Sequence, residues 1–301
     1  MQKIQLVQKI KKLLGLHFLY FSPGHYYSTI PSQEDITSDE KYSYQDINLC
    51  EDEQFVYLQK ISQYSNDIFF EDQPSKASAY HFLNRYFSYS DATILWCLLA
   101  HEKPRNIVEI GSGFSTACKL EAIKYYNLKS QFLCVDIDFS RLDSLVSGYD
   151  LPAFKKQKSK VQNVDIKNFT TLRKGDILFV DSSHVSKKGS DLHFILFEAL
   201  PQLASGVIIH FHDVFQNFEY PQAWLDEGIF WNEQYILRAF LQNNNAYSIL
   251  LFNALLENKH QLWYEENLPN CLNPHEKYSV GNQKGQWITN LRGQSLWLVK
   301  K

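Results

Sequence analysis

Two glycines between a run of β-forming residues and a helix-like segment constrain the fold of this chain more than any other feature. Residues 106–110 are Asn-Ile-Val-Glu-Ile, Gly111 and Gly113 follow at alternate positions, and Ser115 and Thr116 open a segment with helical spacing. A turn from a strand through glycine into a helix exposes backbone N–H groups at the positive end of the helix dipole. We therefore expect a nucleotide-like cofactor to bind at this turn.

The residues around the glycines distinguish between cofactors. The dinucleotide fingerprint G-x-G-x-x-G requires a third glycine, and Thr116 stands in its place. Glu109 lies two positions before the first glycine, and Asp136 lies at the end of the next β-like run, 131–137. A carboxylate at the end of the second strand can accept hydrogen bonds from both hydroxyls of a ribose. The alternative is a strand-turn-helix whose glycines serve packing alone.

This pattern, E-x-G-x-G followed by a strand that ends in Asp, resembles the first two motifs of class I S-adenosylmethionine (SAM) methyltransferases. The resemblance implies that SAM binds here and that NAD does not. It also implies that the glycines admit the methionine end of SAM, that Asp136 holds the ribose, and that residues after the third strand contact adenine. The implied cofactor residues are Glu109, Gly111, Ser112, Gly113, Ser115, Asp136, Gln162 and Asn163.

The order of the remaining segments predicts an α/β fold. Strand-like runs occur at 106–110, 131–137, 160–164, 176–181, 207–212, 248–253 and 295–300. Helix-like segments occur at 91–101, 114–126, 139–147, 190–204 and 231–243. Alternating strands and helices predict a Rossmann-like, seven-stranded, mostly parallel sheet with helices on both faces. In the methyltransferases that the chain resembles, the last strand inserts antiparallel beside the sixth.

We expect two regions in the chain. Residues 1–90 form a mostly helical N-terminal cap or lid, and residues 91–301 form the SAM-binding core with a long insertion at 254–294. Long connections in compact domains tend to be functional, and both additions can cover the carboxyl ends of the strands, where open α/β sheets bind ligands. Residues 1–18 have amphipathic helical spacing, which favours packing against this domain or a second copy over a membrane surface.

Titratable residues lie at the ends of the fourth and fifth strands. Asp181 ends the run 176–181 and His184 follows it, while His212 and Asp213 end the run that begins at Val207. These ends share one sheet edge with Gly111. Asp181, His212 and Asp213 are hard or borderline ligands, which suit Mg²⁺, Mn²⁺ or a similar divalent ion. The alternative is that the two aspartates cap the helices that follow them.

The positions of these residues also resemble those of functional residues in a second group of enzymes. Asp181 and the pair His212-Asp213 fall where catechol and macrolide-sugar O-methyltransferases hold metal carboxylates, and His184 falls where the catechol enzymes have a lysine base. Histidine in place of the first acidic ligand admits a softer ion, or no metal. The resemblance to bacterial small-molecule methyltransferases includes a block with Tyr26 and Tyr27.

The function that this resemblance implies is O-methylation of a small hydroxylated metabolite or sugar. We expect His184, with Asp181, to act in catalysis as the general base beside a divalent ion. Tyr26 and Tyr27 are expected to contact the acceptor. The setting would be natural product or polysaccharide biosynthesis. Two alternatives stay open: a metal-containing relative with a hydroxylase-like reaction, and an inactive SAM-binding module that mediates assembly.

Composition excludes several classes. The net charge of −3 argues against a nucleic-acid-binding protein, which typically has an excess of positive charge. The 5 cysteines include no C-x-x-C pair, which argues against a zinc ribbon or redox motif and fits a reducing cytoplasm. No run reaches the roughly 18 apolar residues of a membrane span. Homo-oligomerisation stays open.

Overall fold

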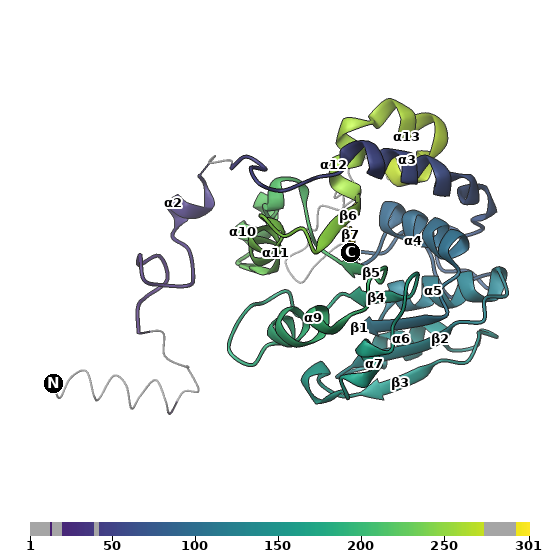
Figure 1. Ribbon diagram of the computed structural model, residues 1–301. Helices are drawn as coiled ribbons and strands as arrows, with labels where there is room; N and C mark the ends of the chain where they lie inside the picture. Colours follow the sequence, from purple (N-terminus) through teal and green to yellow (C-terminus); the bar gives the residue numbers. More distant parts are fainter. Residues whose placement is uncertain (1–12, 14–19, 39–41, 274–292) are drawn as a thin grey trace. The chain divides into compact units, whose positions relative to one another are not determined.

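The structure is a computed structural model that describes residue 13 and residues 20–38, 42–273 and 293–301 (Figure 1). The chain divides into two compact units. The smaller consists of Met1–Tyr42 and Tyr220–Phe230, and the larger consists of Ser43–Glu219 and Trp231–Lys301. Residues 43–90 therefore belong to the same compact unit as the sheet.

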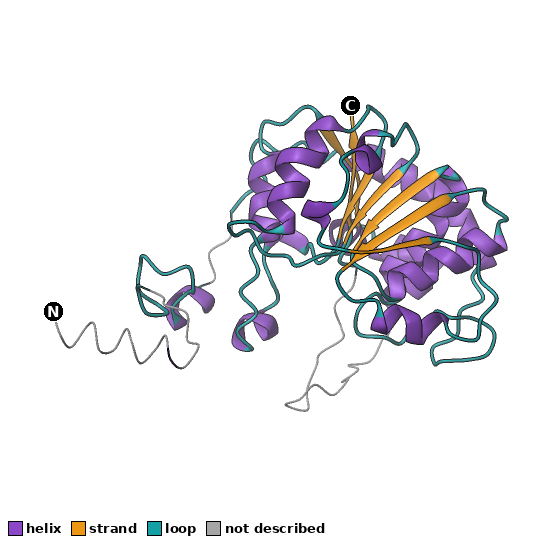
Figure 2. Ribbon diagram, turned by 90° about the horizontal axis from the view of Figure 1, so that it is seen from below, coloured by secondary structure: helices purple, strands orange, loops and turns teal. Residues whose placement is uncertain are grey.

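The larger unit is built on one seven-stranded sheet, which Figure 2 shows as a twisted fan with helices on both sides. The strand order is β3-β2-β1-β4-β5-β7-β6. The strands are β1 (Asn106–Ile110), β2 (Gln131–Asp136), β3 (Lys155–Lys158), β4 (Ile177–Val180), β5 (Ile208–Phe211), β6 (Tyr247–Phe252) and β7 (Leu296–Lys300). The first five in chain order pair in parallel, and β7 lies antiparallel between β5 and β6. The predicted Rossmann-like fold is confirmed, including the antiparallel last strand.

Helices cover both faces of this sheet. In the larger unit they are α3 (Glu51–Ser62), α4 (Tyr89–Glu102), α5 (Phe114–Tyr125), α6 (Ser140–Val146), α7 (Lys167–Thr170), α8 (Asp191–Phe194), α9 (Leu200–Gln202), α11 (Glu233–Leu241), α12 (Asn253–Lys259) and α13 (Gln261–Asn267). Short 3₁₀ turns lie at Gln63–Asp67, Val161–Asn163, Gln216–Phe218 and Pro269–Leu272. Neighbouring strand residues alternate between two cores: Ile107 and Phe179 pack on one face, and Val108 and Leu178 on the other.

The helix α4 lies inside the molecule. Every residue from Tyr89 to Ala100 is buried, including Trp96. A helix that is apolar all round is buried on all sides, and here α4 packs between α3, α5 and the turn Pro269–Leu272. This position places its first turn, with the buried Asp91, deep in the larger unit.

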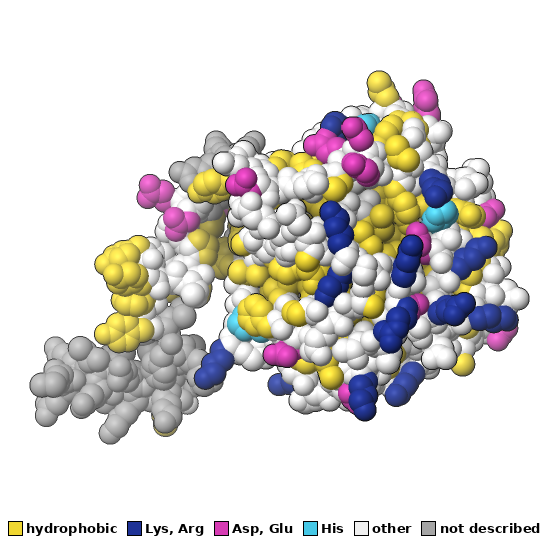
Figure 3. Space-filling view, in the orientation of Figure 1, with side chains coloured by type: hydrophobic (Ala, Val, Ile, Leu, Met, Phe, Trp, Pro, Cys, Tyr) yellow, Lys and Arg dark blue, Asp and Glu magenta, His cyan; other side chains and the backbone are white. Residues whose placement is uncertain are grey.

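The predicted third strand, 160–164, is wrong. That segment forms the 3₁₀ turn Val161–Asn163, and β3 lies a few residues earlier, at Lys155–Lys158. β3 lies at the edge of the sheet, and its three lysines are exposed. Figure 3 shows Lys and Arg side chains over the part of the larger unit where Figure 1 places β3. Lysine on an edge strand discourages pairing with other chains, and it also removes the apolar alternation that reveals a strand.

Other segments differ from expectation in detail. The helix expected at 190–204 is interrupted by the π-helical segment Ile195–Ala199, just before Pro201, which has no N–H to donate. The connection 254–294 contains most of α12, then α13 and the 3₁₀ turn Pro269–Leu272, and residues 274–292 lie outside the described residues. The expected amphipathic helix at 1–18 lies outside them too, apart from Leu13.

The first ninety residues contain helical segments and no strand among those described. The smaller unit holds α2 (Gln33–Ile36) and α10 (Gln222–Asp226). Ser32 caps α2, since its hydroxyl accepts from the backbone N–H of Asp35 at 3.1 Å while its own N–H donates to the Asp35 carboxylate at 2.7 Å. Residues 68–88 of the larger unit have neither helix nor strand. In the described part of the chain, no helix is both long and apolar enough to cross a bilayer.

Candidate active site at the carboxyl edge of the sheet

The glycine turn after β1 presses against the end of β4. Gly111 has a φ of 89°, and a Cβ at this position would lie 1.7 Å from the backbone oxygen of Asp181. Only glycine fits here, because both the conformation and the space exclude a side chain. The predicted cofactor turn and the first predicted metal ligand are thus in direct contact.

Thr116, at the position of the missing third glycine, holds the turn from inside. Its hydroxyl accepts a hydrogen bond from the backbone N–H of Gly113 at 3.1 Å, and its side chain is fully buried. This bond satisfies one of the N–H groups that a helix leaves unpaired at its start.

Glu109 and Ser115 lie behind the turn. The Ser115 hydroxyl donates to Glu109 Oε1 at 2.6 Å, and the Lys119 ammonium lies 2.7 Å from the same oxygen, with both charged side chains fully buried. Burial lowers the pKa of Lys119, while the Glu109 carboxylate opposes that shift. The structure therefore places Glu109 in a network that fixes the turn, with its charge neutralised from within.

Asp136 lies at the carboxyl end of β2, beside the turn. The Ser112 hydroxyl donates to its Oδ2 at 2.6 Å, which joins two of the predicted cofactor residues. Gln162 donates its amide to the backbone oxygen of Gly189 at 2.8 Å, and Asn163 is exposed at the end of the 3₁₀ turn after β3. The structure records no contact of these two residues with the glycine turn among the described residues.

Three predicted metal ligands converge at the ends of β4 and β5. Asp181, His212 and Asp213 each offer one ligand atom, and these atoms all lie within 4.8 Å of one another. His212 Nδ1 lies 3.4 Å from Asp213 Oδ1 and 3.7 Å from Asp181 Oδ1. His212 and Asp213 are buried, and Asp181 is partly exposed.

The surroundings of His212 fit a ligand role. Its Nε2 lies 3.5 Å from the carboxylate of the buried Asp91, within ion-pair distance but without a hydrogen bond to it, and its Nδ1 faces the two aspartates. Asp91 is itself fixed by the amide of Asn253 at 3.1 Å and by the backbone N–H of Gln294 at 2.9 Å. A metal-binding histidine commonly turns its other nitrogen to a carboxylate in this way. One imidazole and two carboxylates suit a divalent cation, either a hard ion such as Mn²⁺ or a borderline ion such as Fe²⁺.

Charges within the cluster depend on one another. Burial alone lowers the pKa of His212, but Asp213 and Asp181 outweigh it and raise that pKa to about 9. Burial raises the pKa of Asp213, while the positive charges of His212 and His184 overcome burial and lower the pKa of Asp181. Without a cation, these carboxylates therefore favour the protonated form of the His212 ring.

His184 lies among three carboxylates. Its φ of 56° is left-handed, its Nε2 lies 3.2 Å from Asp213 Oδ2 and 3.4 Å from Asp181 Oδ1, and its Nδ1 lies 2.7 Å from Glu233 Oε2. Burial lowers the pKa of His184, but Asp213, Asp181 and Glu233 together raise it well above its ordinary value. A general base must start unprotonated, so the predicted role of His184 requires that part of this negative charge be offset.

The alternative in which the two aspartates cap helices is wrong. The next helical segments begin after Ser190, whose hydroxyl accepts from the His193 N–H at 3.3 Å, and after Phe215. His210 lies in the core: its Nε2 pairs with the Ser295 hydroxyl at 2.8 Å and its ring stacks on Phe179. Burial lowers the pKa of His210 well below its usual value.

Tyr26 and Tyr27 belong to the smaller unit and are 82% and 63% exposed. The His25 ring stacks on Tyr26 with ring centres 4.4 Å apart, and its Nδ1 accepts from the Tyr27 N–H at 3.1 Å. Their expected contact with an acceptor stays a prediction.

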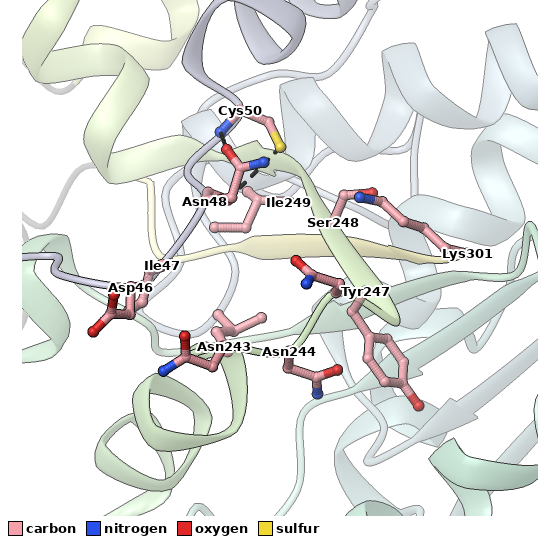
Figure 4. Close-up of a pocket in the computed structure, with 12 residues that line it drawn as sticks. Asp46, Ile47, Asn48, Cys50, Asn243, Asn244, Tyr247, Ser248, Ile249 and Lys301 are labelled. Atoms are coloured by element: carbon pink, nitrogen blue, oxygen red, sulfur yellow. Dashed lines mark hydrogen bonds between the residues drawn. The ribbon is translucent and has the colours of Figure 1, made fainter.

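A cavity of about 270 Å³ lies elsewhere in the larger unit (Figure 4). Asn48, Asn243 and Asn244 line it together with Tyr247, which begins β6. Because β6 runs parallel to β5, its start lies at the opposite edge of the sheet from Asp213. The cavity contains none of the predicted site residues.

Comparison with known proteins identifies the class of this chain. A family model described as a methyltransferase domain matches residues 108–214, from β1 to just past Asp213. An uncharacterised protein of Archaeoglobus fulgidus is 30% identical over 178 residues, which cover 52% of this chain and 76% of that protein. The chain therefore contains a methyltransferase domain, which includes the glycine turn and the cluster of Asp181, His212 and Asp213.

Solved structures are less similar. The Mg-SAM form of cmcI-D160 has a TM-score of 0.34 at 20% identity over 54% of this chain, which spans 64% of that protein. TomG from Streptomyces achromogenes, an O-methyltransferase in complex with SAM, has a TM-score of 0.39 at 12% identity, with 81% of this chain and 90% of TomG covered. An O-methyltransferase from Bacillus cereus in complex with SAH (S-adenosylhomocysteine) scores 0.39 at 12% identity, with 82% and 91% covered. Scores this low carry no conclusion about chemistry.

Two residues at this site escaped the sequence analysis. Asp91 and Glu233 lie in the first turns of α4 and α11, far along the chain from the histidines that they face. Both lie in blocks that resemble bacterial methyltransferases, Tyr89–Ala92 and Trp231–Tyr235, but no local spacing relates them to the strand ends. The signal that could have found them is an acidic residue in the buried first turn of a helix.

Proposed function

We propose that this protein transfers the methyl group of SAM to a hydroxyl oxygen of a small metabolite or sugar, with the help of a divalent cation. One observation carries the proposal. The backbone of Asp181 touches the glycine turn through Gly111, while its side chain joins His212 and Asp213. A methyl donor at the turn and an acceptor at the carboxylates would therefore be neighbours.

The cofactor would lie along the ends of β1 and β2. Gly111 and Gly113 leave the backbone open to the methionine end of SAM, and Asp136 would accept the ribose hydroxyls in exchange for its bond from Ser112. Glu109 and Ser115 would act by holding the turn in place. Contacts of Gln162 and Asn163 with adenine remain part of the proposal.

Methyl transfer depends on alignment, because the sulfonium of SAM already makes its methyl group electrophilic. The enzyme must hold the acceptor oxygen in line with the S–CH₃ bond and remove its proton. A divalent cation held by Asp181, His212 and Asp213 would lower the pKa of an acceptor hydroxyl. His184 would take the proton at Nε2, the nitrogen that faces these carboxylates, once the pKa of its ring is low enough.

Residues outside the central site would enclose it. We propose that residues 1–90 include a cap that carries Tyr26 and Tyr27 to the acceptor, and that residues 254–294 help to cover the 91–301 core. The exposure of the two tyrosine rings favours contact with another molecule over a role in the core.

An inactive assembly module is less consistent with the site. Burying charged groups costs free energy unless they are paired, and a scaffold gains nothing from a cluster of three carboxylates and two histidines. A hydroxylase-like relative would use the same three ligands, so it remains the second candidate.

The experiment is to incubate the protein with methyl-labelled SAM and with catechols, monosaccharides and glycosides, with and without EDTA. We expect label in an acceptor, loss with EDTA and recovery with Mg²⁺ or Mn²⁺. Asp181→Asn should match the EDTA result, and the two effects should not add because they disable the same ion. Calorimetry supplies the cofactor test: tighter binding of NAD than of SAH would overturn the proposal.

A further inference from the structure

The first residue of α11 contacts the His184 ring on the side that faces away from Asp181 and Asp213. Glu233 Oε2 lies 2.7 Å from His184 Nδ1, and the side chains are 2% and 6% exposed. Because a carboxylate can only accept, Nδ1 carries the proton of this bond. Nε2 is then the nitrogen directed at Asp181 and Asp213.

The same turn also holds the backbone of His184. The N–H groups of Asn232 and Glu233 both donate to the His184 carbonyl, at 3.2 and 3.1 Å. Asn232 Oδ1 accepts from the Ser186 N–H at 2.6 Å, and the Trp231 ring packs on the imidazole with centres 4.4 Å apart. A left-handed backbone at a histidine costs free energy and persists only where its surroundings enforce it.

The hydrogen bond to His184 is the main interaction of the Glu233 side chain. Within the described residues, its other oxygen, Oε1, is buried with no hydrogen-bond partner. A carboxylate that is almost completely buried with a single partner is an expensive way to pack a helix, since an apolar residue would serve packing better. Orientation of the imidazole accounts for its presence.

We propose that Glu233 is a positioning residue, which fixes the ring of His184 so that Nε2 faces the acceptor side of the site. The next residue supports the same arrangement from the other strand end: Gln234 Oε1 accepts from the Phe215 N–H at 3.0 Å, just past Asp213. The first turn of α11 thus makes hydrogen bonds to both the loop after β4 and the loop after β5, and fixes their positions relative to each other. The inference rests on the proposed function, because it supplies the reaction that the imidazole serves.

The test uses Glu233→Ala and the isosteric Glu233→Gln in the full-length protein labelled with ¹⁵N-histidine. In the wild type, the Nδ1–H of His184 should give a far-downfield proton resonance protected from exchange with water, assigned by its loss in His184→Asn. Glu233→Ala should lose it, and Glu233→Gln should lose it or shift it upfield, since the charged acceptor is gone. The matched control is Glu219→Gln. This variant removes a carboxylate that accepts a hydrogen bond from Tyr235, a residue of α11, the helix that begins with Glu233.

Turnover supplies the second measurement. Glu233→Ala should lower the rate of methyl transfer about 10–100-fold, the usual cost of losing a residue that orients a catalytic imidazole. The affinity for SAH, measured by calorimetry, should stay within about twofold, since Glu233 lies away from the glycine turn. An unchanged resonance in both variants, or a loss of SAH affinity as large as the loss of rate, would overturn the proposal. If the wild type transfers no methyl group, the proposed function is contradicted instead. The Nδ1–H resonance of His184 then still tests whether Glu233 holds the imidazole ring.

Discussion

The first prediction concerns Asp136, the residue that is proposed to hold the ribose of SAM. In Asp136→Ala, two charge-assisted hydrogen bonds to the ribose would be lost. We expect SAH affinity to fall by about 2–4 kcal/mol. Calorimetry measures it, with Asp143→Ala, an exposed carboxylate paired to Lys156, as the control. Equal affinities for the two variants would place the ribose elsewhere.

The second prediction concerns pH and His212. In protein freed of metal by EDTA, its pKa is raised from 6.5 to about 9 by the aspartates around it. A folded-state pKa above the unfolded value adds stability that is fully present below about pH 6.5 and is lost as the pH rises through about 9. The melting temperature of the metal-free wild type should therefore fall between pH 6.5 and 9. The fall should be smaller in His212→Asn, and equal falls would contradict the charge arrangement described above.

At the scale of residues, the sequence predicts that Asp181, His212 and Asp213 lie close together, and the structure brings them together, while their binding of a metal stays a prediction. Asp181, His212 and Asp213 were recognisable because each interrupts an apolar strand at its end, and parallel strands end at one edge. Asp91 and Glu233 were not, because they approach the histidines only through the packing of α4 and α11. The raised pKa of His184 was also beyond sequence reasoning, since it comes from carboxylates on three separate elements.

At the scale of elements, the turn between β1 and α5 gives the third prediction. In Gly111→Ala the new Cβ would meet the Asp181 carbonyl, and the backbone would also be strained at a φ of 89°. We expect a loss of about 3 kcal/mol or more in the free energy of unfolding. Gly189→Ala is the matched control: its φ is 75° but its surroundings are open, so it should cost only about 1–2 kcal/mol. Urea denaturation of both variants separates strain from collision, and similar losses would show that the turn can yield.

Helices and strands could be predicted from the sequence where their buried positions require apolar residues. β1, β2, β4, β5 and β7 are apolar runs, and their positions followed from that. The edge strand β3 is lysine-rich and exposed, so hydrophobic periodicity pointed instead to the buried valines just after it, Val161 and Val164. The π-helical segment in 195–199 depends on how the chain accommodates Pro201, which spacing does not reveal.

The fourth prediction belongs to the whole molecule. The larger unit contains all seven strands and both hydrophobic cores, so deleting residues 1–31 should leave its circular dichroism and its SAH affinity nearly unchanged. Turnover should be abolished if Tyr26 and Tyr27 contact the acceptor. Replacing both tyrosines by alanine in the full chain should reproduce the loss, and full activity in either protein would assign this segment to structure alone.

The position of β7 has a consequence for how the protein is made. β6 pairs only with β7 in the described sheet, and β7 follows it by more than forty residues while also pairing with β5. During synthesis the first five strands can assemble as they leave the ribosome, but β6 has no strand to pair with until β7 has emerged. Until then β5 has one unpaired edge and β6 has two, and this is the period in which the nascent chain would depend most on chaperones.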